Sequence, residues 1–191
     1  MPRRSTVAVV ALLAVGGCSA EPGTPTRSSS TTPTTSTSSP DNTRPASSRP
    51  RELKLDGREP CGLLTADQLT RLDIDRPGEP MEVAALRSTG CNWTTTRTST
   101  TLVPVTAEGI EAWTDGKRLG RPEDIEPISG FRAITVTVAS DAERCDVMVD
   151  TGVGQYLAAA FSVTAPDPSK VPEPCDGARR LAEAAMQNLL K

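Results

Sequence analysis

Residues 131–138 read Phe-Arg-Ala-Ile-Thr-Val-Thr-Val, and this stretch decides the fold class. Its density of β-branched residues predicts a strand, and the alternation places its aliphatic side chains on one face. Two further strand patterns follow at 145–149 and 155–164, and the Gly-containing segment 150–154 between them predicts a hairpin loop. Because short loops join antiparallel neighbours, the three segments predict an antiparallel meander.

Two helices are predicted to flank this sheet. Thr65-Ala66-Asp67-Gln68 fits a capping box, which predicts a short helix over 66–72. Near the other end of the domain, Asp176 fits the N-cap of a second helix, whose apolar residues form one stripe at helical spacing. That stripe must be buried, so we expect the helix to pack on the apolar face of the sheet.

The fold class predicted is therefore α+β: an antiparallel β-sheet with a short N-terminal helix and a C-terminal amphipathic helix packed on it. The patterns elsewhere are weaker. They favour strands at 90–96 and 102–106, a helix at 108–115, loops at 73–80 and 116–127, and an extended connector at 165–174, and they leave 81–86 ambiguous.

The N-terminal residues have the layout of an export signal. Two arginines precede a short apolar run, which is too short to span a bilayer as a helix. The run ends in Val15-Gly16-Gly17-Cys18, which matches the bacterial lipobox. The motif implies cleavage after Gly17, removing residues 1–17 as a lipoprotein signal peptide, and lipidation of Cys18. A chance cysteine behind an ordinary secretory signal is the alternative interpretation.

A tether is predicted between this anchor and the domain. From Pro22 to Pro50, 22 of 29 residues are Ser, Thr or Pro, and no aromatic residue is present. Such a segment cannot bury enough apolar surface to offset its ordering entropy. The predicted organisation is a signal peptide over 1–17, a disordered tether over 18–54 and a single domain over 55–191.

The remaining cysteines predict two disulfides. The exported context favours pairing, and four cysteines allow three connectivities. Cys61 and Cys175 each follow a proline and precede a helix, whereas Cys91 and Cys145 lie in strand patterns. Pairing like with like predicts the bonds Cys61–Cys175 and Cys91–Cys145.

Charge and composition argue against several classes of function. The segment 52–191 carries 22 acidic and 15 basic residues, a net charge of −7, which is not the electrostatic footprint of a nucleic-acid-binding domain. The chain has no histidine, which removes the commonest general base and the commonest metal ligand. We therefore predict no catalytic residues, no metal site, no cofactor and no nucleic-acid partner.

Three local patterns each have a functional and a simpler structural interpretation. Glu123-Asp124-x-Glu126 suits a hard cation but lacks the spacing of a calcium loop, so a solvated charged loop is favoured. Gly152-x-Gly154 opens no helix, which favours a hairpin turn over a phosphate site. Trp93 fits a ligand groove, but packing against a disulfide is the simpler interpretation.

A set of short motifs carries a family resemblance. They are Glu59-Pro60-Cys61, Cys91-x-Trp93, Gly130-Phe131-x-Ala133, Cys145-x-Val147-x-Val149 and Pro174-Cys175, in that order. With the lipobox, they resemble DUF3558, a family of actinobacterial lipoproteins whose domain has no known function. The resemblance spans about residues 59–191. It implies an α+β domain on the outer face of the membrane and supplies no catalytic residues.

Three functions are compatible with these features. The first is a non-enzymatic lipoprotein, anchored on the extracytoplasmic face of the cell membrane, whose domain binds an envelope protein or a small ligand. The second is a regulatory or sensory accessory to a membrane signalling system. The third is a carboxylate-dependent envelope hydrolase, which requires two carboxylates that face each other in a cleft.

Overall fold

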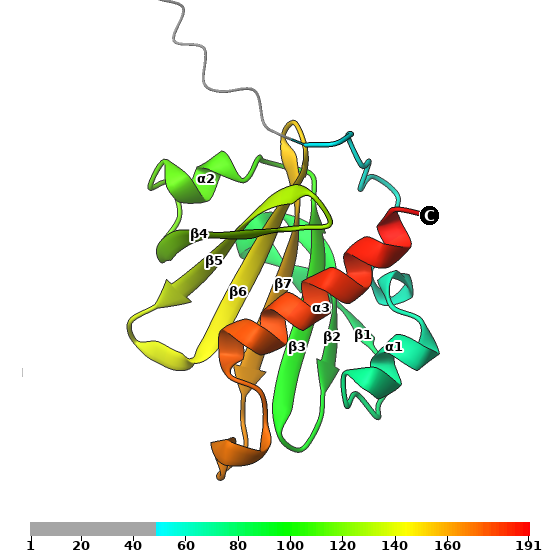
Figure 1. Cartoon of the computed structure of the whole chain (residues 1–191), viewed down its shortest axis with the longest axis vertical. Helices are drawn as coiled ribbons and strands as arrows, with labels where there is room; N and C mark the ends of the chain where they lie inside the picture. The colour runs from blue at the N-terminus through cyan, green and yellow to red at the C-terminus, as the bar shows by residue number, and fades with distance from the viewer. Residues whose placement is uncertain (1–48) are drawn as a thin grey trace, which may run out of the picture. The chain divides into compact units, whose positions relative to one another are not determined.

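An antiparallel sheet forms the centre of the computed structural model, which describes residues 49–191 (Figure 1). Within these residues it has seven strands in the order β1-β2-β3-β7-β6-β5-β4, and every neighbouring pair is antiparallel. The strands are β1 (Glu79–Val83), β2 (Ser88–Thr94), β3 (Thr98–Val105), β4 (Arg121–Ile128), β5 (Phe131–Val138), β6 (Asp141–Gly152) and β7 (Gln155–Val163). The predicted meander is confirmed, because β5, β6 and β7 are consecutive neighbours.

Three α-helices and three short 3-10 helices accompany the sheet in the described part of the chain. They are η1 (Pro60–Leu63), α1 (Ala66–Arg71), η2 (Ala84–Leu86), α2 (Glu111–Thr114), η3 (Pro168–Lys170) and α3 (Pro174–Leu189). The capping box is confirmed: Gln68 N donates to Thr65 Oγ1 at 3.3 Å, and Thr65 N donates to Gln68 Oε1 at 2.9 Å. Helix α3 begins two residues before the predicted N-cap, so Asp176 lies in its first turn and Glu173 is the N-cap.

Strand β4 corrects the prediction of a loop over 116–127. Pro122 and Pro127 lie in this strand together with three acidic residues, a composition that is also typical of loops. Because β4 is an edge strand, one side of its backbone has no partner, and proline is tolerated there. The opposite edge, β1, likewise contains Pro80 and two glutamates.

Each face of the sheet carries its own apolar cluster. Helix α3 lies across one face (Figure 1), where its stripe packs against inward residues of the central strands such as Val147, Leu157 and Phe161. Because successive side chains of a strand point to opposite faces of the sheet, the residues next to these inward residues lie on the other face. That second cluster contains Val103, Val105, Ile110, Ile134, Val136, Met148, Tyr156 and Ala158, with Trp113 packed against it.

Both predicted disulfide pairings are wrong. The bonds are Cys61–Cys91 and Cys145–Cys175, each closing a sequence separation of 30 residues. The strand order explains the correction, because β2 and β6 are separated by β3 and β7. Three strand spacings amount to about 14 Å, well beyond the ~7 Å limit between bonded Cα atoms. Cys91 and Cys145 therefore bond to helical segments above their own strands.

The ordered part of the domain begins before residue 55. Arg49 Nη1 lies 2.5 Å from Asp150 Oδ1, and the Asp150 side chain is only 2% exposed. Leu53 N donates to the carbonyl of Thr151 at 2.8 Å, and Leu53 and Leu55 are both buried. Residues 49–54, assigned to the tether on sequence, thus contact the domain.

The predicted signal peptide, Cys18 and the rest of the tether lie outside the described residues. Among residues 49–191, no helix is long and apolar enough to cross a membrane.

Candidate functional site: a cation-lined pocket

The structure shows the surroundings of Trp93, of the two glycines at 152 and 154, and of the acidic run at 123–126. Trp93 is 1% exposed and packs in the cluster under α3 together with Cys91, so it lines no groove there. Gly152 and Gly154 belong to the β6–β7 hairpin, as the turn interpretation predicted. The acidic run lies on edge strand β4, where Asp124 pairs with Arg132 at 2.9 Å. No group of three potential metal ligands occurs within 49–191.

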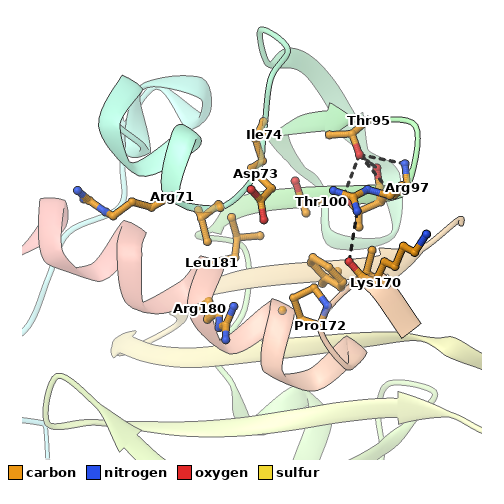
Figure 2. A pocket seen from close by; sticks show the side chains of 15 residues that line it. Arg71, Asp73, Ile74, Thr95, Arg97, Thr100, Lys170, Pro172, Arg180 and Leu181 are labelled. Atoms are coloured by element: carbon orange, nitrogen blue, oxygen red, sulfur yellow. Dashed lines mark hydrogen bonds between the residues drawn. The ribbon is translucent and has the colours of Figure 1, made fainter. Parts of the chain in front are cut away.

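A small pocket lies where α1, the β2–β3 hairpin and the first half of α3 meet (Figure 2). We call it the α1–α3 pocket. Its volume is about 40 Å³, which exceeds the roughly 10–15 Å³ needed for one water. It has space for an acid group or a similar small moiety, and a larger ligand would extend into solvent. Its lining includes Arg71, Asp73, Ile74, Arg97, Thr100, Phe161, Lys170, Arg180 and Leu181.

Hydrogen bonds from one glutamine and one asparagine hold α1 against α3. Gln68 Nε2 donates to the carbonyl of Ala184 at 2.8 Å, and Asn188 Nδ2 donates to Gln68 Oε1 at 2.6 Å. Gln68 is only 4% exposed. These bonds fix the wall of the pocket that the end of α1 provides.

Arg97 is held by its neighbours at the tip of the β2–β3 hairpin. Its carbonyl accepts hydrogen bonds from Thr164 N at 2.8 Å and Ala165 N at 3.0 Å, and its own N–H donates to Thr95 Oγ1 at 3.2 Å. Its Nη1 donates to the carbonyl of Lys170 at 3.3 Å. One hydrogen bond therefore restrains the guanidinium of this exposed side chain, and its other donors have no partner among the described residues.

Asp73 faces the same hollow from the segment after α1. It adopts a left-handed backbone conformation with φ 56°, which aspartate tolerates better than most residues. Its side chain forms no hydrogen bond or ion pair with another described residue. Figure 2 shows Asp73, Thr100 and Arg97 directed toward the hollow, whereas the charged ends of Arg71 and Lys170 point away from it.

A second hollow, of about 160 Å³, lies on the other face of the sheet. Its lining is largely apolar, with Met81, Val83, Trp113 and Met148 around Ala158 and Ala160. Asp146 reaches this hollow and pairs with Arg144 at 2.9 Å. Burial raises the pKa of Asp146 above its usual value of 3.8, and the hydrogen bond from Arg144 offsets only part of that shift.

A chain of polar contacts crosses the border of this second hollow. Trp113 Nε1 donates to Tyr156 Oη at 3.0 Å, Tyr156 donates to Glu108 Oε1 at 2.9 Å, and Arg118 pairs with Glu108 at 2.7 Å. Burial raises the pKa of the Tyr156 hydroxyl far above its usual value of 10. The hydroxyl therefore keeps its proton, and the chain serves to fasten the α2 segment to the sheet.

Paired carboxylates, which the hydrolase hypothesis needs, are not found together in these hollows. The α1–α3 pocket contains Asp73 and the second hollow contains Asp146. Two shallower depressions of the described surface hold Asp141 and Glu183, again one carboxylate each.

No sequence motif indicates which residues line the α1–α3 pocket. Its residues come from the end of α1, the β2–β3 hairpin, β7, the connector before α3 and α3 itself. No two of these segments form a motif in the linear sequence, and only the packing of α1 on α3 brings them together.

Comparisons with known proteins agree with the motif resemblance. A family model described as "Protein of unknown function (DUF3558)" matches residues 13–188. No curated protein and no solved structure matches the chain. Since the family model spans nearly the whole sequence, the chain belongs to DUF3558, a family of proteins of unknown function.

Proposed function

We propose that this protein is a lipid-anchored protein of the cell envelope whose extracytoplasmic domain binds a ligand or partner without catalysing a reaction. The observation that carries the proposal is the sequence Val15-Gly16-Gly17-Cys18 followed directly by a Ser/Thr/Pro-rich segment. The aliphatic residue and the two glycines suit cleavage before Cys18, and the cysteine provides the thiol for a thioether-linked lipid.

The physical chemistry of acyl anchors supports stable attachment. Each buried methylene contributes about 0.8 kcal/mol, and two or more chains convert marginal membrane binding into durable binding. A coil of the tether's length spans about 30–35 Å on average. The domain would thus be held near the membrane and still be able to reach partners around it.

The two disulfides are consistent with export. All four cysteines of the described domain are paired, and stable disulfides are typical of oxidising compartments outside the cytosol. This support is independent of the lipobox, because it rests on a different part of the chain.

The domain is better suited to bind a ligand in a surface hollow than to pair with a partner strand at a sheet edge. Both sheet edges carry prolines and acidic residues, which discourage a partner strand from pairing there. The α1–α3 pocket and the second hollow are two concave surfaces of the described residues that offer space for a ligand.

The anchor is tested by detergent-phase partition of the natively expressed protein. We expect the wild type in the membrane fraction and in the detergent phase, and Cys18→Ser in the aqueous phase or retained with its signal. Ser19→Ala is the matched control, since it changes the neighbouring residue and leaves the thiol in place. Wild type in the aqueous phase would refute the anchor.

A further inference from the structure

We infer that the α1–α3 pocket binds a small ligand carrying a carboxylate or phosphate group attached to an apolar part. This inference rests on the proposed binding function of the domain and is independent of its lipid anchor. In this pocket Arg97 recognises the acid group, and Asp73 limits the charge of the ligand.

The charge of the pocket lining differs in sign from the net charge of the domain. The segment 52–191 has a net charge of −7, yet the pocket is lined by four cations and one anion: Arg71, Arg97, Lys170 and Arg180 against Asp73. Of these four cations, only Lys170 has a carboxylate partner among the described residues, which is Asp167 at 3.9 Å. The rim of the pocket is therefore more positive than the acidic domain as a whole. The charged ends of Arg71 and Lys170 point away from the hollow, so Arg97 is the cation that faces an anionic ligand there (Figure 2).

Arg97 is placed to contact an acid group in this pocket. Its backbone is fixed by three hydrogen bonds, and the carbonyl of Lys170 occupies only one of its guanidinium donors. The planar guanidinium offers paired donors that match carboxylate and phosphate oxygens. Because the hydrogen bond to Lys170 already restrains this exposed side chain, part of the conformational entropy is lost before it binds an acid group.

An apolar wall lies beside this cation. Ile74, Phe161 and Leu181 line the pocket, and each is at most 6% exposed. A hydrocarbon group attached to the acid would cover the remaining surface of these side chains. The cavity volume of about 40 Å³ limits what enters to the acid group and the first few atoms attached to it.

Asp73 sets the limit on ligand charge. Its carboxylate faces the hollow and would repel an anion, so it lowers the affinity for a simple acid and disfavours multiply charged ligands. Arg97 and Asp73 therefore have opposite effects on the binding of one probe. A loss of pocket structure would weaken binding in both variants, which separates recognition from folding.

Isothermal titration calorimetry on the full-length protein in a neutral detergent tests the inference, with butyl phosphate and butyrate as probes. We expect saturable binding of one or both acids and none of butanol or butylammonium. Arg97→Gln should weaken binding at least about tenfold, and Asp73→Asn should strengthen it. Asparagine also tolerates the left-handed conformation at residue 73, so this variant is expected to fold.

Arg144→Gln is the matched control, because it removes an arginine that lines the opposite face and leaves the pocket intact. Competition by short-chain phosphatidylglycerol would assign the natural acid group to a lipid headgroup, and its absence would assign it to a soluble acid. Equal binding of butanol, unchanged affinity in Arg97→Gln, weaker binding in Asp73→Asn, or no saturable binding of either acid would each overturn the site. None of these results bears on detergent-phase partition, so a failure here is distinguishable from a failure of the anchor.

Discussion

Gly177 packs directly against the ring of Phe161, so closely that a β-carbon at residue 177 would lie 2.5 Å from the ring. The contact joins the first turn of α3 to β7 and forms part of the wall of the α1–α3 pocket. A glycine near the start of a helix is thus explained by close packing and not by backbone flexibility.

Gly177→Ala is expected to destabilise the protein even though alanine is the better helix former. Helix propensity favours alanine by about 1 kcal/mol, but overpacking a tight contact costs about 1–3 kcal/mol, and here neither backbone can move easily. Urea unfolding measures the change. Gly62→Ala is the control, because a β-carbon there meets nothing closer than 3.7 Å. Equal stability of the two variants would contradict this packing.

The disulfide pattern is expected to appear directly in peptide maps of the non-reduced protein. Cross-linked peptides should contain Cys61 with Cys91 and Cys145 with Cys175. Because both loops have the same sequence separation of 30 residues, replacing either pair by alanine should cost a similar free energy of unfolding, about 3–4 kcal/mol. A peptide linking Cys91 to Cys145 would contradict the strand order, which places β3 and β7 between these two cysteines.

Tyr156→Phe is expected to lower the free energy of unfolding by about 1–3 kcal/mol. The substitution keeps the buried ring but leaves Trp113 Nε1 and Glu108 without their shared partner. The effect should be non-additive with Glu108→Gln, since both substitutions interrupt the same polar chain. Additive losses in a double-mutant cycle would mean that the chain does not act as a unit.

Asp146→Asn is expected to change the pH dependence of stability. The folded state raises the pKa of Asp146, mainly through burial. Protonation of Asp146 therefore stabilises the folded state at pH values below the pKa of the unfolded state, near 3.8. This stabilisation is lost as the pH rises through the higher pKa of the folded state. Relative to Asp146→Asn, the wild type should lose stability as the pH rises above the unfolded pKa of 3.8 and through the higher folded pKa.

Urea unfolding at several pH values measures this difference. Asp124→Asn is the exposed comparison, since its side chain is 71% exposed and belongs to a surface pair. A wild type that gains stability over Asp146→Asn as the pH rises would have the opposite sign and would show that the pair with Arg144 dominates burial.

Local sequence patterns predicted the elements that depend on near neighbours. The bounds of β5 agree with the predicted 131–138 at both ends, and the capping box at Thr65 and Gln68 forms as expected. The alternation of a strand and the cap of a helix depend on residues that lie close together in sequence. A sequence pattern can therefore predict them.

The features that depend on long-range order could not be predicted in the same way. Strand β4 was mistaken for loop because proline and acidic residues mark both loops and protected sheet edges. The disulfides were mispaired because β3 and β7 are neighbours only in space, which separates Cys91 from Cys145. The α1–α3 pocket could not be predicted for the same reason, since Asp73 and Arg97 line one pocket only when distant segments pack together.

The central claim, attachment through Cys18, is tested most directly by the mass of the N-terminal peptide of the protein extracted from membranes. The account predicts a peptide that begins at Cys18 and carries the added mass of a diacylglyceryl group on the sulfur, with or without a further acyl chain on the amine. A peptide that still contains residues 1–17, or one that begins at Cys18 with an unmodified thiol, would contradict it.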